Sequence, residues 1–256
     1  MKANGAILWR GPSLIDGAPI VAIAVGLSHA SSNRKTGAML QTYILRDDVS
    51  PLEAVRIGAD ASICGSCPHR GHLARLEDGS LRNAGRTCYV NLGQGPLGVW
   101  RAYKRGRYPE ATGITVLGAG RIVRLGTYGD PAAVPATIWA ALTQRATGRT
   151  GYTHQWRRDY AQNLKGLCMA SCDSEAEAAE AQALGWRTFR VAMPGDLART
   201  PVEAICPASA EAGKKLTCSQ CLACAGANGR RGSIVIQAHG GFAVMANVRK
   251  RAPAAL

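Results

Sequence analysis

Short apolar runs separated by polar turns recur along the chain, and their length predicts buried strands. The first two clear runs cover residues 20–27 and 39–45, with a polar segment at residues 31–37 between them. From residue 121 onward the pattern becomes regular. It predicts further strands at residues 121–125, 151–156, 167–171, 187–193 and 234–237, with another around Ile205.

Helical patterns alternate with these strands. Residues 51–57 follow the N-cap Ser50, and residues 173–184 begin with an acidic, capped turn and stop before Gly185. A third helix is expected over residues 132–145. This alternation predicts an α/β protein with a parallel sheet, folded as a TIM-like (β/α) barrel, irregular or incomplete, with cysteine-rich metal-binding insertions. We expect one domain over residues 1–247 and a loose basic tail over residues 248–256.

The charge balance indicates a polyanionic partner. Lys and Arg number 31 against 17 Asp and Glu, which gives a net charge of +14. We expect nucleic acid, and DNA in particular; a basic protein without such a partner is the alternative. No apolar run reaches about 18 residues, and the first residues lack a secretory signal. We therefore expect a cytoplasmic protein with no membrane partner.

Nine cysteines in a reducing compartment indicate metal binding rather than a disulfide framework. The C-terminal set is Cys206 followed by Cys218, Cys221 and Cys224. Three thiolates at x2 spacing and a remote Cys-Pro are typical of [4Fe–4S] ligation, and Zn²⁺ accepts the same four ligands. The set predicts a complete metal site but does not decide between Zn and [4Fe–4S].

A second set, Cys64, Cys67 and Cys88, supplies three thiols and predicts a second metal site over residues 64–88. Either His69, His72 or a remote cysteine completes it, or one position stays open for chemistry. Of the two remaining cysteines, Cys168 is expected in the core, and Cys172 is a weaker candidate ligand.

Polar residues that follow predicted strands are candidates for catalysis, because barrel enzymes place their chemistry there. Asp130, in Gly-Asp-Pro, is a candidate nucleophile or base, with a helix N-cap as the alternative. His154 lies in a polar, aromatic segment that favours a pocket. Asp60 is a weaker acid–base candidate, and Asp173 is interpreted as a helix cap.

Basic and aromatic residues are interleaved in two segments, as in proteins that hold unstacked or flipped nucleotides. An amphipathic helix with solvated charges is the alternative for the first segment. The expected nucleic-acid contacts are Trp100, Arg101, Tyr103, Lys104, Arg105, Arg107, Trp156, Arg157 and Arg158.

Taken together, the segments at residues 64–70 (CGSCPHR), 129–131 (GDP), 152–156 (YTHQW) and 206–224 resemble a group of phage and prophage proteins. That group is cysteine-rich and TIM-barrel-like and has no defined activity. The resemblance spans roughly residues 20–240 and implies a phage origin.

The chain is also similar in part to phage 7-deazaguanine DNA transglycosylases, relatives of tRNA-guanine transglycosylases. This resemblance implies Asp130 as the nucleophile and the C-terminal cysteines as a zinc site. Those enzymes carry Cys-x-Cys-x2-Cys and a downstream His, whereas this chain has Cys-x2-Cys-x2-Cys, an upstream Cys206 and His239. The chain also resembles radical S-adenosylmethionine enzymes in part. It lacks their usual Cys-x3-Cys-x2-Cys motif, because Cys88 lies far from Cys64 and Cys67.

These features lead to three hypotheses. The first is a metal-containing enzyme that modifies nucleic acid, in its specific form a transglycosylase that exchanges guanine for a 7-deazaguanine base. Asp130 would attack the sugar, and Asp60 or His154 would move protons. The second is an iron–sulfur enzyme centred on Cys64, Cys67 and Cys88. The third is a non-catalytic DNA-binding protein braced by metals.

Overall fold

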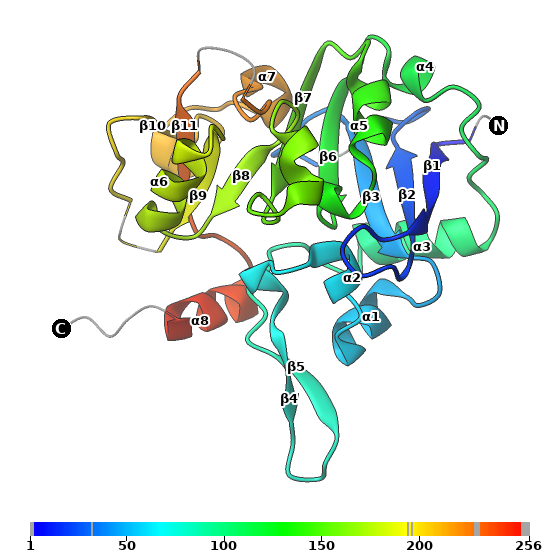
Figure 1. Ribbon diagram of the computed structural model, residues 1–256, viewed down its shortest axis with the longest axis horizontal. Coiled ribbons are helices and arrows are strands. Elements are labelled where there is room, and N and C mark those ends of the chain that lie inside the picture. The colour runs from blue at the N-terminus through cyan, green and yellow to red at the C-terminus, as the bar shows by residue number, and fades with distance from the viewer. Residues whose placement is uncertain (1–2, 32, 194, 196, 228–230, 252–256) are drawn as a thin grey trace.

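The computed structural model describes residues 3–31, 33–193, 195, 197–227 and 231–251. Its core is a nine-stranded mixed sheet in the order β1-β2-β3-β6-β7-β8-β9-β11-β10 (Figure 1). The strands are β1 (Gly5–Pro12), β2 (Pro19–Val25), β3 (Leu40–Arg46), β6 (Ile122–Tyr128), β7 (Gly148–Thr153), β8 (Met169–Cys172), β9 (Thr188–Ala192), β10 (Glu203–Ile205) and β11 (Ser233–Gln237). From β3 to β10 all neighbouring strands are parallel.

The α/β class and the parallel sheet are confirmed, but the predicted barrel is wrong in one respect. In the described part of the chain, the sheet ends at β1 and β10 and does not close. β2 runs antiparallel to β1 and β3, because the links on either side of it contain no crossover helix. The free edge of β1 is covered by residues 109–111, which exchange two backbone hydrogen bonds with Ile7.

Helices and short 3-10 turns surround the sheet. The α-helices are α1 (Pro51–Ile57), α2 (Ala61–Cys64), α3 (Gly95–Lys104), α4 (Ile114–Gly118), α5 (Ala136–Thr143), α6 (Glu175–Ala183), α7 (Cys218–Cys221) and α8 (Phe242–Arg251). The 3-10 turns are η1 (Pro68–Arg70), η2 (Pro131–Ala133), η3 (Asp159–Leu164) and η4 (Ala210–Ala212). None of the described helices is long and apolar enough to cross a membrane.

The predicted helices have the expected caps, with two differences in extent. The side chain of Ser50 accepts a hydrogen bond from Glu53 N (3.3 Å), and that of Ser174 accepts one from Glu177 N (3.1 Å). The helix expected at residues 132–145 is divided into η2 and α5 at Pro135, since proline disfavours helix in the preceding residue. α8 runs to Arg251, so residues 248–251 of the expected loose tail are helical, while 252–256 lie outside the described residues.

Two features of the sheet determine where chemistry can occur. Its centre is apolar, with β2 fully buried from Ile20 to Ala24 and with Trp139 and Trp156 buried beside it. The segment between β3 and β6 covers the edge where the parallel strands end. It carries α1, α2, η1, α3 and a projecting hairpin of β4 (His72–Arg75) and β5 (Leu81–Ala84), at the lower side of Figure 1. Ligands of open parallel sheets bind at this carboxyl edge.

Candidate metal centre

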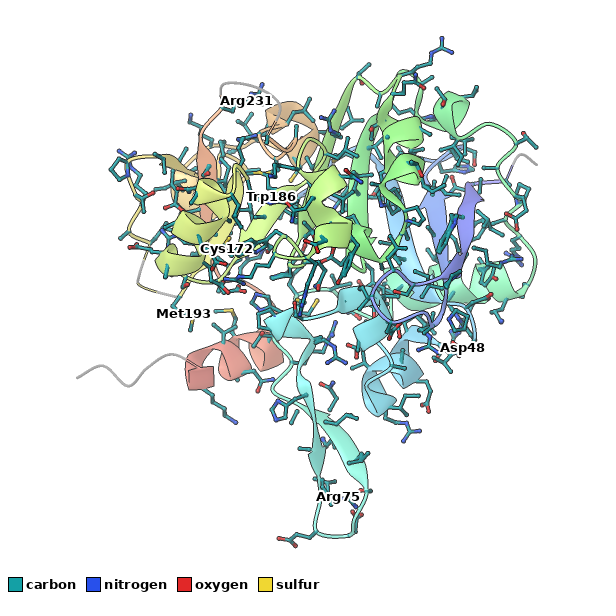
Figure 2. The ribbon with its side chains drawn as sticks, in the orientation of Figure 1. Asp48, Arg75, Cys172, Trp186, Met193 and Arg231 are labelled. Atoms are coloured by element: carbon teal, nitrogen blue, oxygen red, sulfur yellow. The ribbon has the colours of Figure 1, made fainter. Side chains whose placement is uncertain are left out.

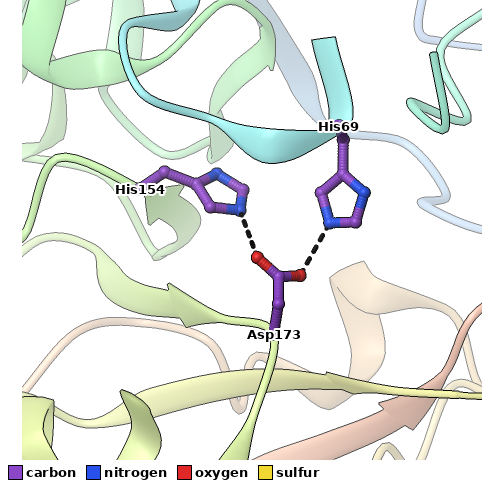
Figure 3. A group of neighbouring side chains, drawn as sticks. All are labelled: His69, His154 and Asp173. Atoms are coloured by element: carbon purple, nitrogen blue, oxygen red, sulfur yellow. Dashed lines mark hydrogen bonds and ion pairs between the residues drawn. The ribbon is translucent and has the colours of Figure 1, made fainter. Parts of the chain in front are cut away.

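Three side chains from separate segments meet at the carboxyl edge. His154 directly follows β7, Asp173 directly follows β8, and His69 lies in η1 of the covering segment. His69 Nε2 lies 2.7 Å from Asp173 Oδ1, and His154 Nε2 lies 3.5 Å from Asp173 Oδ2 (Figure 3). Side-chain exposures of 24%, 18% and 26% for His69, His154 and Asp173 leave the group accessible from solvent.

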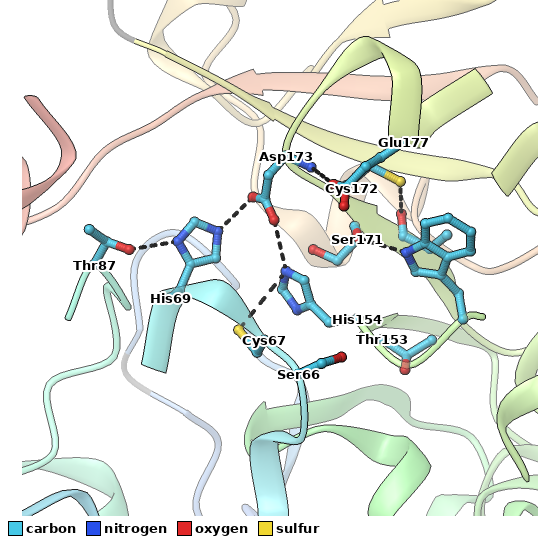
Figure 4. Close-up of polar contacts among 12 residues, drawn as sticks. Ser66, Cys67, His69, Thr87, Thr153, His154, Ser171, Cys172, Asp173 and Glu177 are labelled. Atoms are coloured by element: carbon cyan, nitrogen blue, oxygen red, sulfur yellow. Dashed lines mark hydrogen bonds and ion pairs between the residues drawn. The ribbon is translucent and has the colours of Figure 1, made fainter. Parts of the chain in front are cut away.

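This group has the spacing of metal ligands. In the part of the chain that the structure describes, no other set of three or more His, Cys, Asp or Glu side chains has its ligand atoms all within 4.8 Å of one another. A thiol stands beside it, since Cys67 Sγ lies 4.0 Å from His154 Nε2 (Figure 4). Two imidazoles, a carboxylate and a nearby thiol form a donor set that suits Zn²⁺ or Fe²⁺.

The orientation of His154 argues against a proton relay of the Cys-His-Asp kind. In such a triad, one ring nitrogen faces the nucleophile and the other faces the carboxylate. Here a single nitrogen, Nε2, faces both Cys67 and Asp173. Donor atoms that converge on one point, rather than in a chain, are what a metal ion requires.

Hydrogen bonds outside the group hold its members in place. The backbone N–H of His154 donates to Asp130 Oδ2 (2.8 Å), and the other oxygen of that carboxylate accepts from Ala132 N (2.9 Å). His69 Nδ1 contacts Thr87 Oγ1 at 2.8 Å. Metal-binding histidines commonly use the second ring nitrogen in this way to fix the ring.

Cys67 is positioned by a tight turn. Gly65 has φ of +55°, and a Cβ on it would come within 2.5 Å of the Gln155 side chain, so the turn requires glycine. Gln155 in turn donates to Cys64 O (3.1 Å) and accepts a hydrogen bond from Ser66 Oγ (3.2 Å). The residue after His154 therefore ties the first cysteine loop to the end of β7.

The charges within the group stabilise one another. Burial would raise the pKa of Asp173, but hydrogen bonds from His154 and His69 outweigh it and hold the pKa well below the usual range. Burial would lower the pKa of His154, but Cys67 and Asp173 raise it well above its usual value. The carboxylate is therefore ionised, and a metal ion that binds here would displace the extra proton of His154.

The predicted catalytic residues have different surroundings from one another. His154 belongs to the group described above. Asp130 lies next to it but is only 7% exposed, and both its oxygens accept backbone hydrogen bonds, so the N-cap interpretation accounts for its position. Asp60 is fully buried and pairs with Arg70 (2.7 Å), with Arg86 at 4.0 Å. Burial raises its pKa, and the two arginines oppose that shift.

All nine cysteines are free, and the N-terminal set gathers near the group without reaching ligand spacing. Burial raises the pKa of Cys64 well above its usual value, and the neighbouring Cys67 and Cys88 raise it further. His69, one of the candidates for the fourth ligand of this set, points to Asp173 instead. The weaker candidate Cys172 is fully buried, and its thiol donates to Ala170 O and does not point to the other candidate ligands.

The predicted nucleic-acid contacts differ in solvent exposure and in the partners that they already have. Trp156 is 1% exposed and belongs to the core, so it cannot stack on a nucleotide here, whereas Arg157 is exposed and pairs with Glu177 and Glu180. Trp100 and Tyr103 are half-buried, and Tyr103 and Lys104 bind Asp47. The exposed cations that remain are Arg101, Arg105, Arg107 and Arg158.

Asp173 is the functional candidate that the sequence interpretation missed. It was interpreted as a helix cap, whereas Ser174 makes the capping bond of α6. Its position directly after a strand, like that of Asp130 and His154, was the signal that could have identified it.

The chain matches no protein-family model, no curated protein and no solved structure. The resemblances to phage proteins, transglycosylases and radical enzymes therefore stay predictions, and function is inferred from the chemistry of the site.

Proposed function

We propose that this protein is a metal-dependent enzyme that modifies nucleic acid, with its catalytic metal held by His69, His154 and Asp173. The observation that carries the proposal is the convergence of these three ligand atoms within 4.8 Å of one another at the carboxyl edge of the sheet. The three residues are far apart in the sequence, so the group is formed by the fold and not by a local motif.

The donor set suits catalysis better than a purely structural role. Structural zinc sites use four protein ligands, while catalytic sites use about three and keep a position for water or substrate. Here there are three ligands, and the Cys67 thiol lies nearby, 4.0 Å from His154 Nε2. This thiol can either bind the metal as a fourth ligand or leave that position to water or substrate. A metal ion in this position would supply Lewis-acid chemistry to a bound substrate.

The charge of the chain supports a polyanionic substrate. The net charge is +14, and exposed arginines lie on two elements of the segment between β3 and β6, which covers the carboxyl edge. Arg75 and Arg82 lie on the β4–β5 hairpin, which begins three residues after His69 and projects from the body (Figure 2). Arg101 and Arg105 lie on and after α3. These cations would hold phosphates while a base enters the site, as base-modifying enzymes require.

The specific reaction expected from the transglycosylase resemblance fits less well. A nucleophile must reach the sugar carbon, whereas both oxygens of Asp130 accept backbone hydrogen bonds in a buried position. We assign Asp130 to holding the His154 backbone and assign the chemistry to the metal. Base exchange with a 7-deazaguanine remains one outcome of the experiment below.

The iron–sulfur enzyme is the second candidate, and one observation favours it. Cys67 Sγ lies 4.0 Å from His154 Nε2, Cys67 N donates to Cys64 O (3.1 Å), and Cys88 N donates to His69 O (2.9 Å). Three thiols beside two imidazoles would suit a cluster with one open iron. The non-catalytic, metal-braced DNA-binding protein is the third.

The test is an assay for altered nucleosides. Protein reloaded with Zn²⁺ or, anaerobically, with Fe²⁺ is incubated with single- and double-stranded DNA, with and without a 7-deazaguanine base. The DNA is then digested and its nucleosides are analysed by mass spectrometry. We expect a new nucleoside with the metal-loaded protein and none with His154→Ala, because that change removes a ligand.

His72→Ala is the matched control. His72 is exposed, lies three residues from His69 and belongs to no ligand group, so this variant should keep full activity. Equal activity of His154→Ala and wild type would refute the proposed centre. DNA binding without any altered nucleoside would support the non-catalytic alternative instead.

A further inference from the structure

We propose that Cys206, Cys218, Cys221 and Cys224 hold a second metal centre through four thiolates, separate from the His69–His154–Asp173 centre. The fold brings these cysteines together from two directions. Cys206 follows β10 and donates its N–H to Val235 O of β11 (2.8 Å). The 218–224 loop reaches β7, where Cys224 O accepts from Gly151 N (3.1 Å).

The thiols share one apolar environment. Cys206 and Cys224 are each 7% exposed and pack with Met169, Ile234 and Ile236 in one cluster. The fold therefore places Cys206 and Cys224 in one cluster, and Cys221 and Cys218 precede Cys224 by three and six residues.

The backbone of the loop turns between Cys221 and Cys224. Leu222, which ends α7, has φ of +50° and is the one non-glycine residue with positive φ in the described chain. A leucine in this left-handed conformation costs free energy and persists only when other contacts hold it. Arg187 supplies such contacts by donating to Ala223 O (2.9 Å) and Gly226 O (2.8 Å).

The strongest evidence for bound charge is two buried arginines. Arg124 and Arg187 are 7% and 9% exposed, and across the described residues neither forms an ion pair with a carboxylate. Arg124 donates to the hydroxyl of Tyr89 (3.0 Å) and lies near Cys218 and Cys224, while Arg187 lies near Cys224. Buried cations require compensation. A dication bound by four thiolates keeps a net negative charge that two guanidiniums match.

The spacing of the thiols bears on what they bind. No three of the four sulfurs lie all within 4.8 Å of one another. A single Zn²⁺, with Zn–S near 2.3 Å, would hold thiolates roughly 3.8 Å apart. A [4Fe–4S] cluster holds each thiolate on a separate iron and therefore farther apart, so metal analysis distinguishes the two.

The centre would also support the first site through β7. Gly151 N donates to Cys224 O, and Tyr152 packs against the cluster that contains Cys206 and Cys224. Both residues lie just before His154. Fixing Cys224 on a metal would therefore fix the strand that presents a ligand of the other centre.

The experiment measures iron, sulfide and zinc in protein purified anaerobically, for wild type, Cys221→Ser, Cys172→Ala and His154→Ala. We expect Cys221→Ser to lose thiolate-bound metal that the other two variants keep. Cys172 is the control because its buried thiol lies outside both sets. About four irons with sulfide would support a cluster, and one zinc would support a single ion at the same thiolates.

A second measurement uses wild-type protein alone, in case Cys221→Ser does not fold. Thiols are alkylated before and after metal removal and mapped by mass spectrometry. We expect the four cysteines to be protected by metal and to react once it is removed. Equal alkylation in both states, or unchanged metal in a folded Cys221→Ser, would overturn the proposal.

Discussion

Replacing Asp173 with Asn is expected to lower the metal affinity of the His69–His154–Asp173 centre by more than about 100-fold, since loss of an outer partner alone costs about 10- to 100-fold. The amide keeps the size of the carboxylate but supplies no negative charge. The carboxylate of Asp173 faces both His69 Nε2 at 2.7 Å and His154 Nε2 at 3.5 Å, so the substitution affects both other ligands. We expect activity on nucleic acid to be lost with the metal.

Competition with a chromophoric chelator measures this affinity. Asp159→Asn is the matched control, because Asp159 is an exposed aspartate at the start of η3 and outside the ligand group. We expect the control to bind metal like the wild type. Wild-type affinity in Asp173→Asn would show that the carboxylate is not a ligand. Asp173 is 26% exposed, so the substitution should leave the fold intact.

The largest effect on stability is expected at a buried ion pair between β9 and β10. Glu203 Oε1 accepts from Arg190 Nε and Oε2 from Arg190 Nη2, each at 2.9 Å, and the side chains are 0% and 4% exposed. Glu203→Gln leaves a buried guanidinium facing a neutral amide. We expect the free energy of unfolding to fall by about 3–5 kcal/mol, a large part of a typical total of about 5–15 kcal/mol.

Glu175→Gln is the control for this prediction. Glu175 Oε1 lies 3.7 Å from the same Arg190 Nη2 but its side chain is 59% exposed, so its loss should cost at most about 1 kcal/mol. Denaturant unfolding compares the two variants. Equal losses would show that burial of the Glu203 pair does not govern stability here.

The same pair has a pH signature. Burial would raise the pKa of Glu203, but hydrogen bonds from Arg190 and Thr200 outweigh it and lower the pKa below its usual value. A lowered folded-state pKa gives stability that is present above the unfolded pKa and is lost as pH falls through the folded pKa. The difference in unfolding free energy between wild type and Glu203→Gln should therefore narrow in acid.

The sequence pattern predicts most of the helices and strands but little of how the strands pair. Apolar runs located β2 and β3, and the capped acidic start located α6, because these signals are local. Closure into a barrel depends on which strands meet at the two edges. That was decided by the short links around β2 and by residues 109–111 against β1, which no periodicity reveals.

The site was predictable in part for the same reason. His154 was identified because it follows a strand, and Asp173 was missed because an aspartate before a helix is also a common cap. The meeting of His69 with Asp173 spans 104 residues along the chain. Trp156 and Arg157 were interpreted as nucleotide contacts from their residue types alone. The burial of Trp156 and the ion pairing of Arg157 with α6 depend on tertiary packing, which the sequence pattern does not reveal.

The central claim is that His69, His154 and Asp173 bind the catalytic metal, and the most direct measurement is anomalous X-ray diffraction from crystals of metal-loaded protein. We expect a peak at the absorption edge of the metal, about 2.0–2.2 Å from both imidazole Nε2 atoms and from an Asp173 oxygen. A peak that lies only among cysteines, with the His69–Asp173 hydrogen bond intact, would contradict the assignment.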